Sequence, residues 1–355
     1  MTTYTAASQQ EVAKYLILPQ LHKIRHMKTL LLAILAVCIA STSLAANAKE
    51  LKRLKKLHSV YDQGKAYKNY DTVAILGANV RFRIAAKQSN ATSWKKEVFV
   101  KFSAIATLEG INDELFQEIA DEYHKMLVER FEKLGLTVLP YSAIEATTAY
   151  AALKAKGKTS TMHSKKNWGV AKVFSGEQTP FITFNPVLPF GPHAKVAKEL
   201  NAILFNSVVT LDFSHIGIKI TQSGESNYNK TRRTIYTEGK SSIVPALHID
   251  GHTYGNNLMP RYEDNTYSAS VLPRGLHLLQ IDLKPSEIES PVNFAISAES
   301  CKRCPLNFKS GSFIKSSNLD TVVITADPES YKEAALDLLN QYLDQAFALY
   351  QAQKG

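Results

Sequence analysis

The sequence predicts an α/β protein with a mixed β-sheet, packed helices, strand-rich insertions and a C-terminal helix. Three observations indicate this fold class. A long amphipathic helix pattern ends in a glycine and turns directly into an apolar strand, the middle of the chain is rich in strand patterns, and a second long helix pattern closes the chain. With 355 residues, 45% apolar and 21% charged, the composition is that of an ordinary globular protein of one or two domains.

The first 48 residues have the pattern of a targeting segment. Lys28 follows Met27, residues 30–39 are apolar, and Ala46-Asn47-Ala48 fits a small-x-small cleavage site, so residues 27–48 are predicted to be a secretory signal peptide. Their apolar run is shorter than the roughly 20 residues that a membrane-spanning helix needs, although a retained anchor is the alternative. We interpret residues 1–26 as upstream sequence read from a start codon placed too early.

Charge favours a partner outside the cytoplasm. Beyond residue 48 the chain has 38 basic and 31 acidic residues. A basic exported protein meets anionic lipid, anionic cell-wall polymer or an acidic protein, and nucleic acid is not an expected partner. Residues 49–70 form a basic leader and linker, in which Leu51, Leu54 and Leu57 lie among lysines. This segment either lies on an anionic membrane or is solvated and frayed.

We expect residues 71–355 to form a single α/β domain. A first strand is predicted over residues 72–76. Residues 80–84 and 98–108 then alternate between apolar and polar types and predict a hairpin inserted before the first helix, with a turn over residues 88–93. That helix is predicted from the N-cap Asn112 to Gly135, which supplies a left-handed C-terminal position. Residues 136–139 predict a strand that helices cover on both sides.

The rest of the domain is predicted in the same way. Residues 142–155 favour a helix capped by Ser142, residues 156–192 a long loop that is either functional or disordered, and residues 192–200 a short helix. Asp327 and Pro328 predict the start of the last helix, whose Tyr342, Phe347 and Tyr350 are expected to pack in the core. The strands predicted between these helices cover residues 202–204, 208–220 with a bend near Gly217, 234–237, 243–249, 269–272, 276–283 and 321–324.

Cys301 and Cys304 are the only cysteines after residue 48, and in an oxidising compartment we expect them to form a small structural disulfide. No helix pattern follows them, whereas a redox-active pair uses a helix N-terminus to lower its thiol pKa. No histidine follows Cys304, which excludes covalent haem attachment. A zinc site would need two further ligands from His248, His252 or His277.

His248, Asp250 and His252 are weak candidates for metal ligands. They alternate along a strand-like run, so their side chains would face one way and could bind a divalent ion. Gly251 and Gly255 favour ordinary polar turn residues instead. The sequence has no phosphate-binding glycine-rich loop, no Gly-x-Ser-x-Gly and no His-Glu-x-x-His, so no catalytic residue and no cofactor is predicted.

The order of the predicted elements resembles that of known cell-envelope proteins. A first strand at residues 72–76 is followed by a helix ending in Lys133-Leu134-Gly135-Leu136-Thr137-Val138-Leu139, by a short helix opening at Ser142, and by Ala197-Lys198-Glu199-Leu200-Asn201-Ala202-Ile203-Leu204 leading into a strand. This order resembles the fold shared by the curli secretion protein CsgG, the penicillin-binding-protein activator LpoB and the TolB N-terminal domain. CsgG and LpoB resemble lipoproteins by their signal cysteine, whereas Cys38 here lies inside the apolar run. The resemblance implies a binding or assembly role in the envelope.

These observations predict an exported, non-enzymatic binding or assembly factor in the periplasm or associated with the outer membrane. Its expected partner is an envelope protein or a cell-wall or membrane surface, and it could form a homo-oligomer. One alternative is a subunit of an outer-membrane secretion pore, suggested by the hairpin over residues 80–108. The other is a periplasmic metal-binding protein or enzyme that uses His248, Asp250, His252 and the cysteine pair.

Overall fold

The computed structural model describes residues 48–54, 58–62, 71–92, 98–155, 163–165, 169–178, 192–225, 234–249, 256–259, 279–283, 290, 295, 302–309 and 313–354. The chain divides into two compact units, residues 1–54 and 55–355. In the first unit residues 48–54 are helical, and Arg53 pairs with Glu50 at 2.6 Å. The segment before residue 48, including nearly all of the predicted signal peptide, lies outside the described residues.

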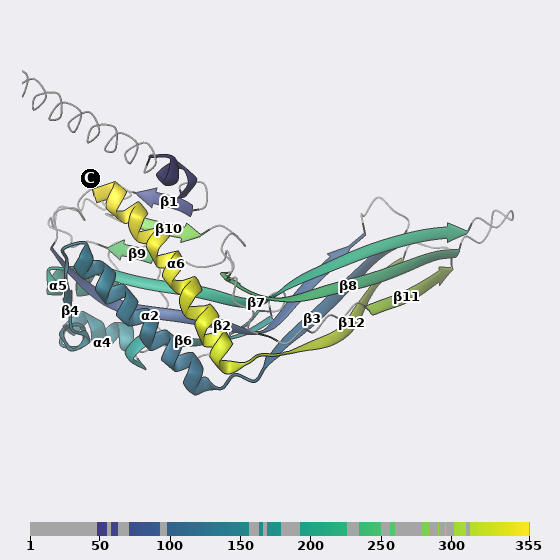
Figure 1. The fold of residues 1–355 in the computed structure, drawn as a ribbon, viewed down its shortest axis with the longest axis horizontal. Helices are drawn as coiled ribbons and strands as arrows, with labels where there is room; N and C mark the ends of the chain where they lie inside the picture. Colours follow the sequence, from purple (N-terminus) through teal and green to yellow (C-terminus); the bar gives the residue numbers. More distant parts are fainter. Residues whose placement is uncertain are drawn as a thin grey trace, which may run out of the picture. The chain divides into compact units, whose positions relative to one another are not determined.

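The second unit is built on a mixed β-sheet with helices, which confirms the predicted α/β class (Figure 1). At its centre β2 (Thr72–Ala91) runs parallel to β7 (Ile203–Glu225), from Val73 opposite Ile203 to Phe82 opposite Leu211. Short strands flank this pair. They are β4 (Thr137–Leu139) and β6 (Gly169–Ser175) beside β2, β5 (His163–Lys165) beside β6, and β9 (Asn256–Met259), β10 (Leu279–Leu283) and β1 (His58–Asp62) following from β7.

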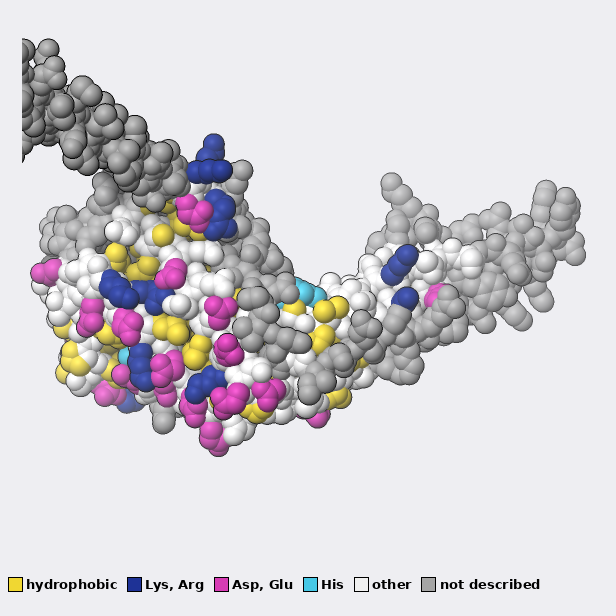
Figure 2. All heavy atoms as spheres, in the orientation of Figure 1, with side chains coloured by type: hydrophobic (Ala, Val, Ile, Leu, Met, Phe, Trp, Pro, Cys, Tyr) yellow, Lys and Arg dark blue, Asp and Glu magenta, His cyan; other side chains and the backbone are white. Residues whose placement is uncertain are grey.

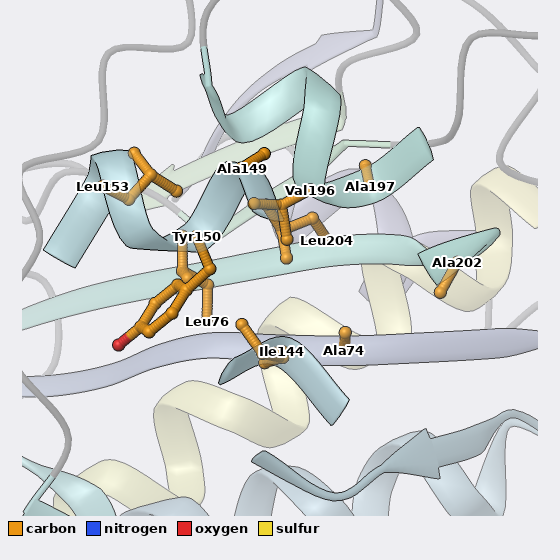
Figure 3. Close-up of a cluster of buried hydrophobic side chains, with 10 residues drawn as sticks. All are labelled: Ala74, Leu76, Ile144, Ala149, Tyr150, Leu153, Val196, Ala197, Ala202 and Leu204. Carbon is orange, nitrogen blue, oxygen red and sulfur yellow. The ribbon is translucent and has the colours of Figure 1, made fainter. Parts of the chain in front are cut away.

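Helices cover both faces of this part of the sheet. On one face lie α2 (Asp113–Lys133) and α6 (Pro328–Lys354), where Phe116 of α2 stacks on Phe82 of β2 with ring centroids 4.4 Å apart. Phe131 of α2 meets Phe347 of α6 at 4.9 Å. On the other face lie α3 (Tyr141–Glu145), α4 (Thr148–Lys154) and α5 (Pro192–Leu200). Figure 3 shows the apolar cluster beneath them: Ala74, Leu76, Ile144, Ala149, Tyr150, Leu153, Val196, Ala197, Ala202 and Leu204.

The limits predicted for the first long helix are confirmed. The side chain of Asn112 accepts a hydrogen bond from the N–H of Leu115 at 3.0 Å, and Gly135 has φ of 78°. The strand that follows was predicted to be covered on both sides, and this is wrong. Thr137 is exposed and Val138 is half-buried, because β4 pairs only with β2 among the described strands and is therefore an edge strand.

Residues 142–155 form two short helices instead of the single predicted one. α3 begins directly after Pro140, so Ser142 lies inside the helix and is not its cap. At the start of α4, the N–H groups of Thr148 and Ala149 donate to the carboxylate of Glu199 on α5 at 2.7 and 3.2 Å. A carboxylate is stabilising at a helix N-terminus, where backbone donors have no partner within the helix. The contact with Glu199 stabilises the start of α4, and the sequence near Thr148 gives no sign of it because Glu199 is distant in the chain.

Residues 156–192 do not form one loop, which corrects the prediction. β5 and β6 lie within this segment, and β6 pairs with β2 with Ala171 and Val173 buried. The turn after β6 then lies on α2, because the N–H of Glu177 donates to Asp121 at 2.8 Å and the side chain of Gln117 donates to the carbonyl of Ser175 at 2.9 Å. The remaining residues of the segment lie outside the described ranges.

The long strands are interrupted at fewer places than predicted. β2 continues through residues 88–91, where a turn was predicted, and β8 (Thr234–Ile249) joins two predicted strands. Gly217, where a bend was predicted, pairs in register with Ser242, and the register shift between β7 and β8 lies between Asp212 and Ser214. The predicted strand over residues 269–272 is outside the described part of the chain.

Past Arg83 and Asp212 the long strands continue beyond the helices, and we call this part the hairpin extension (Figure 1). It contains two hairpins, one from the end of β2 with β3 (Val98–Glu109) and one from the end of β7 with β8. β12 (Phe313–Thr325) pairs with β3, and β11 (Lys302–Lys309) pairs with β8. The two hairpins pack on each other, and Gly239 of β8 lies directly against the buried ring of Phe102 on β3. A Cβ added to Gly239 would be only 2.4 Å from that ring.

Gly110 joins β3 to α2 in a conformation that side chains resist. Its φ is 92°, and a Cβ there would lie 2.4 Å from the carbonyl oxygen of Ala326. We expect Gly110→Ala to lower the free energy of unfolding by about 2–4 kcal/mol, the sum of a left-handed backbone and a steric overlap. Gly135→Ala is the control, since its φ is 78° but no atom lies within 4 Å, and we expect a loss of about 1 kcal/mol. Urea unfolding measures both, and equal losses would contradict the overlap.

Candidate functional site

A cluster of two buried and two half-buried charged and aromatic side chains lies where the hairpin extension meets the helix-covered sheet. Nη1 of Arg83 on β2 forms an ion pair with Oδ2 of Asp212 on β7, and these side chains are only 14% and 7% exposed. His248 on β8 lies opposite Asp212, with its Nε2 4.0 Å from Asp212 Oδ2. The ring of His215 stacks on that of His248, with centroids 4.1 Å apart. The cluster therefore joins both hairpins at their base.

The irregular pairing of β7 with β8 orients His248. Asp212 pairs with His248 but Ser214 pairs with Pro245, so β8 has one extra residue between these two pairs. Proline cannot donate to a strand ladder and is found in sheets at such bulges. Nδ1 of His248 lies 3.2 Å from the carbonyl oxygen of Ala246, which is the acceptor in a hydrogen bond between the two atoms. The other nitrogen, Nε2, is then directed to Asp212.

Asp212 also acts on the C-terminal helix. Burial, and secondly the negative charge of Asp212, raise the pKa of Tyr331 in the first turn of α6, so this phenol is neutral. Oδ1 of Asp212 accepts a hydrogen bond from the N–H of Phe213 at 2.8 Å. One carboxylate thus connects β2, β7 and β8 and influences α6. Removing one partner of a buried charge leaves that charge uncompensated and destabilises the folded state. The cluster therefore has a structural role.

The structure describes one of the three predicted metal candidates. His248 is buried in the sheet, where it lies near Asp212, the carbonyl of Ala246 and the ring of His215. Asp250 and His252 lie outside the described residues. Within the described ranges, no group of three or more His, Cys, Asp or Glu side chains is arranged to hold a metal ion. The metal site therefore stays a prediction.

The predicted disulfide also remains open. Cys304 lies in β11, in register with Gly239 of β8. Cys301 and the further zinc candidate His277 are outside the described segments. The pairing of the two cysteines stays a prediction.

Arg83, Asp212 and His215 were not identified from the sequence. Arg83 and Asp212 are 129 residues apart in the chain, and only the parallel pairing of β2 with β7 brings them together. One signal was available, because Asp212 interrupts the apolar run between Leu211 and Phe213. A carboxylate in a buried strand requires a partner, and an arginine in another strand is the expected one.

A row of basic positions crosses the outer face of the β7–β8 hairpin. Lys219 lies directly opposite Lys240, and Lys240 lies opposite Arg303 of β11. The side chains of Lys219 and Lys240 are exposed. Figure 2 shows Lys or Arg side chains among the described residues of the hairpin extension, whereas side chains of both charges cover the helices. We call Lys219, Lys240 and Arg303 the basic row.

His193 at the start of α5 provides a test of pH dependence. Burial lowers the pKa of His193 from 6.5 to about 4. The folded state therefore binds fewer protons than the unfolded chain, so stability is fully present above pH 6.5 and is lost as the pH falls from 6.5 through about 4. Glutamine does not titrate in this range. We therefore expect the His193→Gln protein to keep the free energy of unfolding, on the order of 3 kcal/mol, that the unchanged protein loses between pH 6.5 and about 4. Urea unfolding of both proteins at pH 7.5, 5.5 and 4.5 measures it, and parallel curves would contradict the assignment.

The fold and the cluster define an α/β protein with a two-hairpin extension of its sheet. Comparisons with protein-family profiles, with curated protein sequences and with solved structures gave no match. Among the helices of the described segments, none has the length and apolar character needed to cross a bilayer.

Proposed function

We propose that this protein is an exported, non-enzymatic binding or assembly factor of the bacterial cell envelope, in the periplasm or at the outer membrane. Its partner is an envelope protein or a cell-wall or membrane surface, which it binds with the hairpin extension. The supporting observation is the extension itself. β2 and β7 have 20 and 23 residues, and their distal parts pair with β3 and β8 beyond Phe82 and Leu211, the last residues paired between β2 and β7.

The extension is larger than the helix-covered core requires. Average strands have about 5–6 residues, and long strands that continue past their covering helices expose surface that other molecules can bind. Val244 of the extension and Val323 of β12 are 50% and 45% exposed, the large apolar side chains most open to solvent in the described structure. The signal-peptide pattern, the basic composition and the resemblance in element order also support a role in the envelope.

A non-enzymatic role is supported by the use of the buried charges. Asp212 on β7 pairs with Arg83 on β2 and lies 4.0 Å from Nε2 of His248 on β8. In this arrangement the carboxylate and the imidazole stabilise the base of the extension. A single-residue scan that finds one His or Asp whose loss abolishes a turnover, while the protein remains folded, would contradict the proposal.

Fractionation and crosslinking test the proposal together. The full chain, expressed with a C-terminal tag, should be found in the periplasmic or the carbonate-extractable membrane fraction, and cytoplasmic retention would contradict export. A photocrosslinking amino acid at Thr221 in the extension should trap an envelope component. The matched control is the same probe at Lys195 on α5, which is also exposed. Equal crosslinking from both positions would contradict a specific role of the extension.

A second candidate function is a subunit of an outer-membrane secretion pore. The alternation along β7 favours it, because Ile216, Ile218 and Ile220 are half-buried while Gly217 and Lys219, between them, are exposed. A hairpin with one apolar face can exchange contact with its neighbour for contact with lipid. This candidate predicts a ring that is stable in detergent and resistance to carbonate extraction. A monomer in detergent would contradict it.

A further inference from the structure

We propose that the basic row binds the phosphate groups of an anionic phospholipid surface through its exposed lysines, Lys219 and Lys240. This inference rests on the proposed function and names the chemistry of its partner. Neighbouring strands lie about 4.8 Å apart, so the three positions span roughly 10 Å across β7, β8 and β11. Three cationic positions in line on one face of a sheet match a surface that presents several phosphates side by side.

Folding does not account for this row. Like charges directly opposite each other on adjacent strands are destabilising, and here two such pairs share Lys240. The next row along the hairpin contains Thr221 opposite Glu238, so one acidic residue accompanies three basic positions. An anionic partner would neutralise the repulsion between the facing basic residues. The basic row is therefore more favourable when such a partner is bound.

The surroundings of the row favour a flat partner. On the side toward the helices, the adjacent pair on the same face is Gly217 with Ser242, both small. One pair further, Val244 lies opposite His215 and is 50% exposed. Four residues along a strand span roughly 13 Å, so a membrane that contacts the basic row can also receive this apolar side chain among its headgroups.

The chemistry distinguishes lipid from the other anions. A single soluble phosphate is held by converging donors such as a helix N-terminus or a cluster of backbone N–H groups, whereas the row lies on a paired sheet whose N–H groups are engaged in the ladder. Lysines on a flat face attract an anionic bilayer through its surface potential, with no need for a pocket.

The test is co-sedimentation with vesicles of phosphatidylcholine alone and with 30% phosphatidylglycerol, using protein purified from cells that express the full chain. The affected variant is Lys219→Gln with Lys240→Gln, and the matched control is Lys133→Gln with Lys195→Gln, two exposed lysines on helices α2 and α5. We expect binding to anionic vesicles to weaken about fivefold for each lysine of the row, and on the order of 25-fold for both. The control should bind within about twofold of the unchanged protein.

Thermal unfolding distinguishes lost binding from lost folding. Removing two like charges that face each other should leave Tm unchanged or raise it, so the non-binding variant remains folded. Equal weakening in the row variant and the control, unchanged binding by the row variant, or equal binding to neutral and anionic vesicles would each overturn the inference.

Displacement of the protein from anionic vesicles by millimolar inorganic phosphate, without a matching effect of chloride at equal ionic strength, would assign the row to soluble phosphate and overturn the lipid assignment. Crosslinking from Thr221 to an envelope protein without vesicle binding would overturn this inference alone and leave the proposed function standing.

Discussion

Replacing Arg83 with methionine is expected to lower the free energy of unfolding by about 3–5 kcal/mol. The arginine neutralises Asp212, whose side chain is 7% exposed, and its removal leaves a buried carboxylate without that counter-charge, with Nε2 of His248 4.0 Å away. Urea unfolding at pH 7 measures the loss. Lys87→Met is the matched control, because it also replaces a half-buried basic side chain of β2 with methionine, and its effect should stay within about 0.5 kcal/mol.

A double-mutant cycle separates the ion pair from packing. Arg83→Met together with Asp212→Leu replaces both charges with apolar groups, and such replacements are often neutral or stabilising. We expect the double variant to lose clearly less than the sum of the two single variants, with a coupling of about 1–3 kcal/mol. Additive losses would show that the two side chains stabilise the protein independently and would contradict the cluster.

Replacing Phe102 with alanine is expected to cost about 3–5 kcal/mol. The ring is fully buried between the two hairpins, and its removal leaves a cavity between their layers. Because a Cβ at Gly239 would lie 2.4 Å from this ring, Gly239→Val should also destabilise the protein, by about 1–3 kcal/mol from overpacking. Thermal and urea unfolding measure both losses.

The two positions should be coupled. In a Phe102→Ala background, Gly239→Val places its side chain into the new cavity, so its cost should largely disappear. Gly217→Val is the control, since the nearest atom to a Cβ there is 3.8 Å away on the exposed face of the same sheet. A cost for Gly239→Val that is independent of the residue at position 102 would contradict the packing of the hairpins on each other.

Local patterns were sufficient for the long helices. Asn112 and Gly135 delimit α2 because capping and left-handed positions depend on a few neighbouring residues. The same holds for α6, where Tyr342 and Tyr350 are buried as their helical spacing predicted. The break between α3 and α4 was missed because its stabilising group, Glu199, comes from another helix.

Contacts between distant strands account for most of the other differences. The pairing of β6 with β2 turns part of a predicted loop into a strand, and no pattern within residues 156–192 contains that information. The buried cluster has the same origin, because Arg83 and Asp212 meet only when two parallel strands align. His248 was selected from the sequence for its spacing to Asp250 and His252, whereas its contacts in the structure are with residues of β7.

The pairing of β3 with β12 has a consequence for how the protein is made. Val98 pairs with Phe313, and Lys332 on α6 bonds Glu118 on α2 across 214 residues of sequence. Such remote pairings make folding slow, because a long stretch of chain must be brought together before any contact compensates for its lost freedom. During synthesis the emerging chain therefore lacks the partner for β3 and the helix beside α2 until its end is released. Completion of the sheet and of its helix layer is thus coupled to the end of translation.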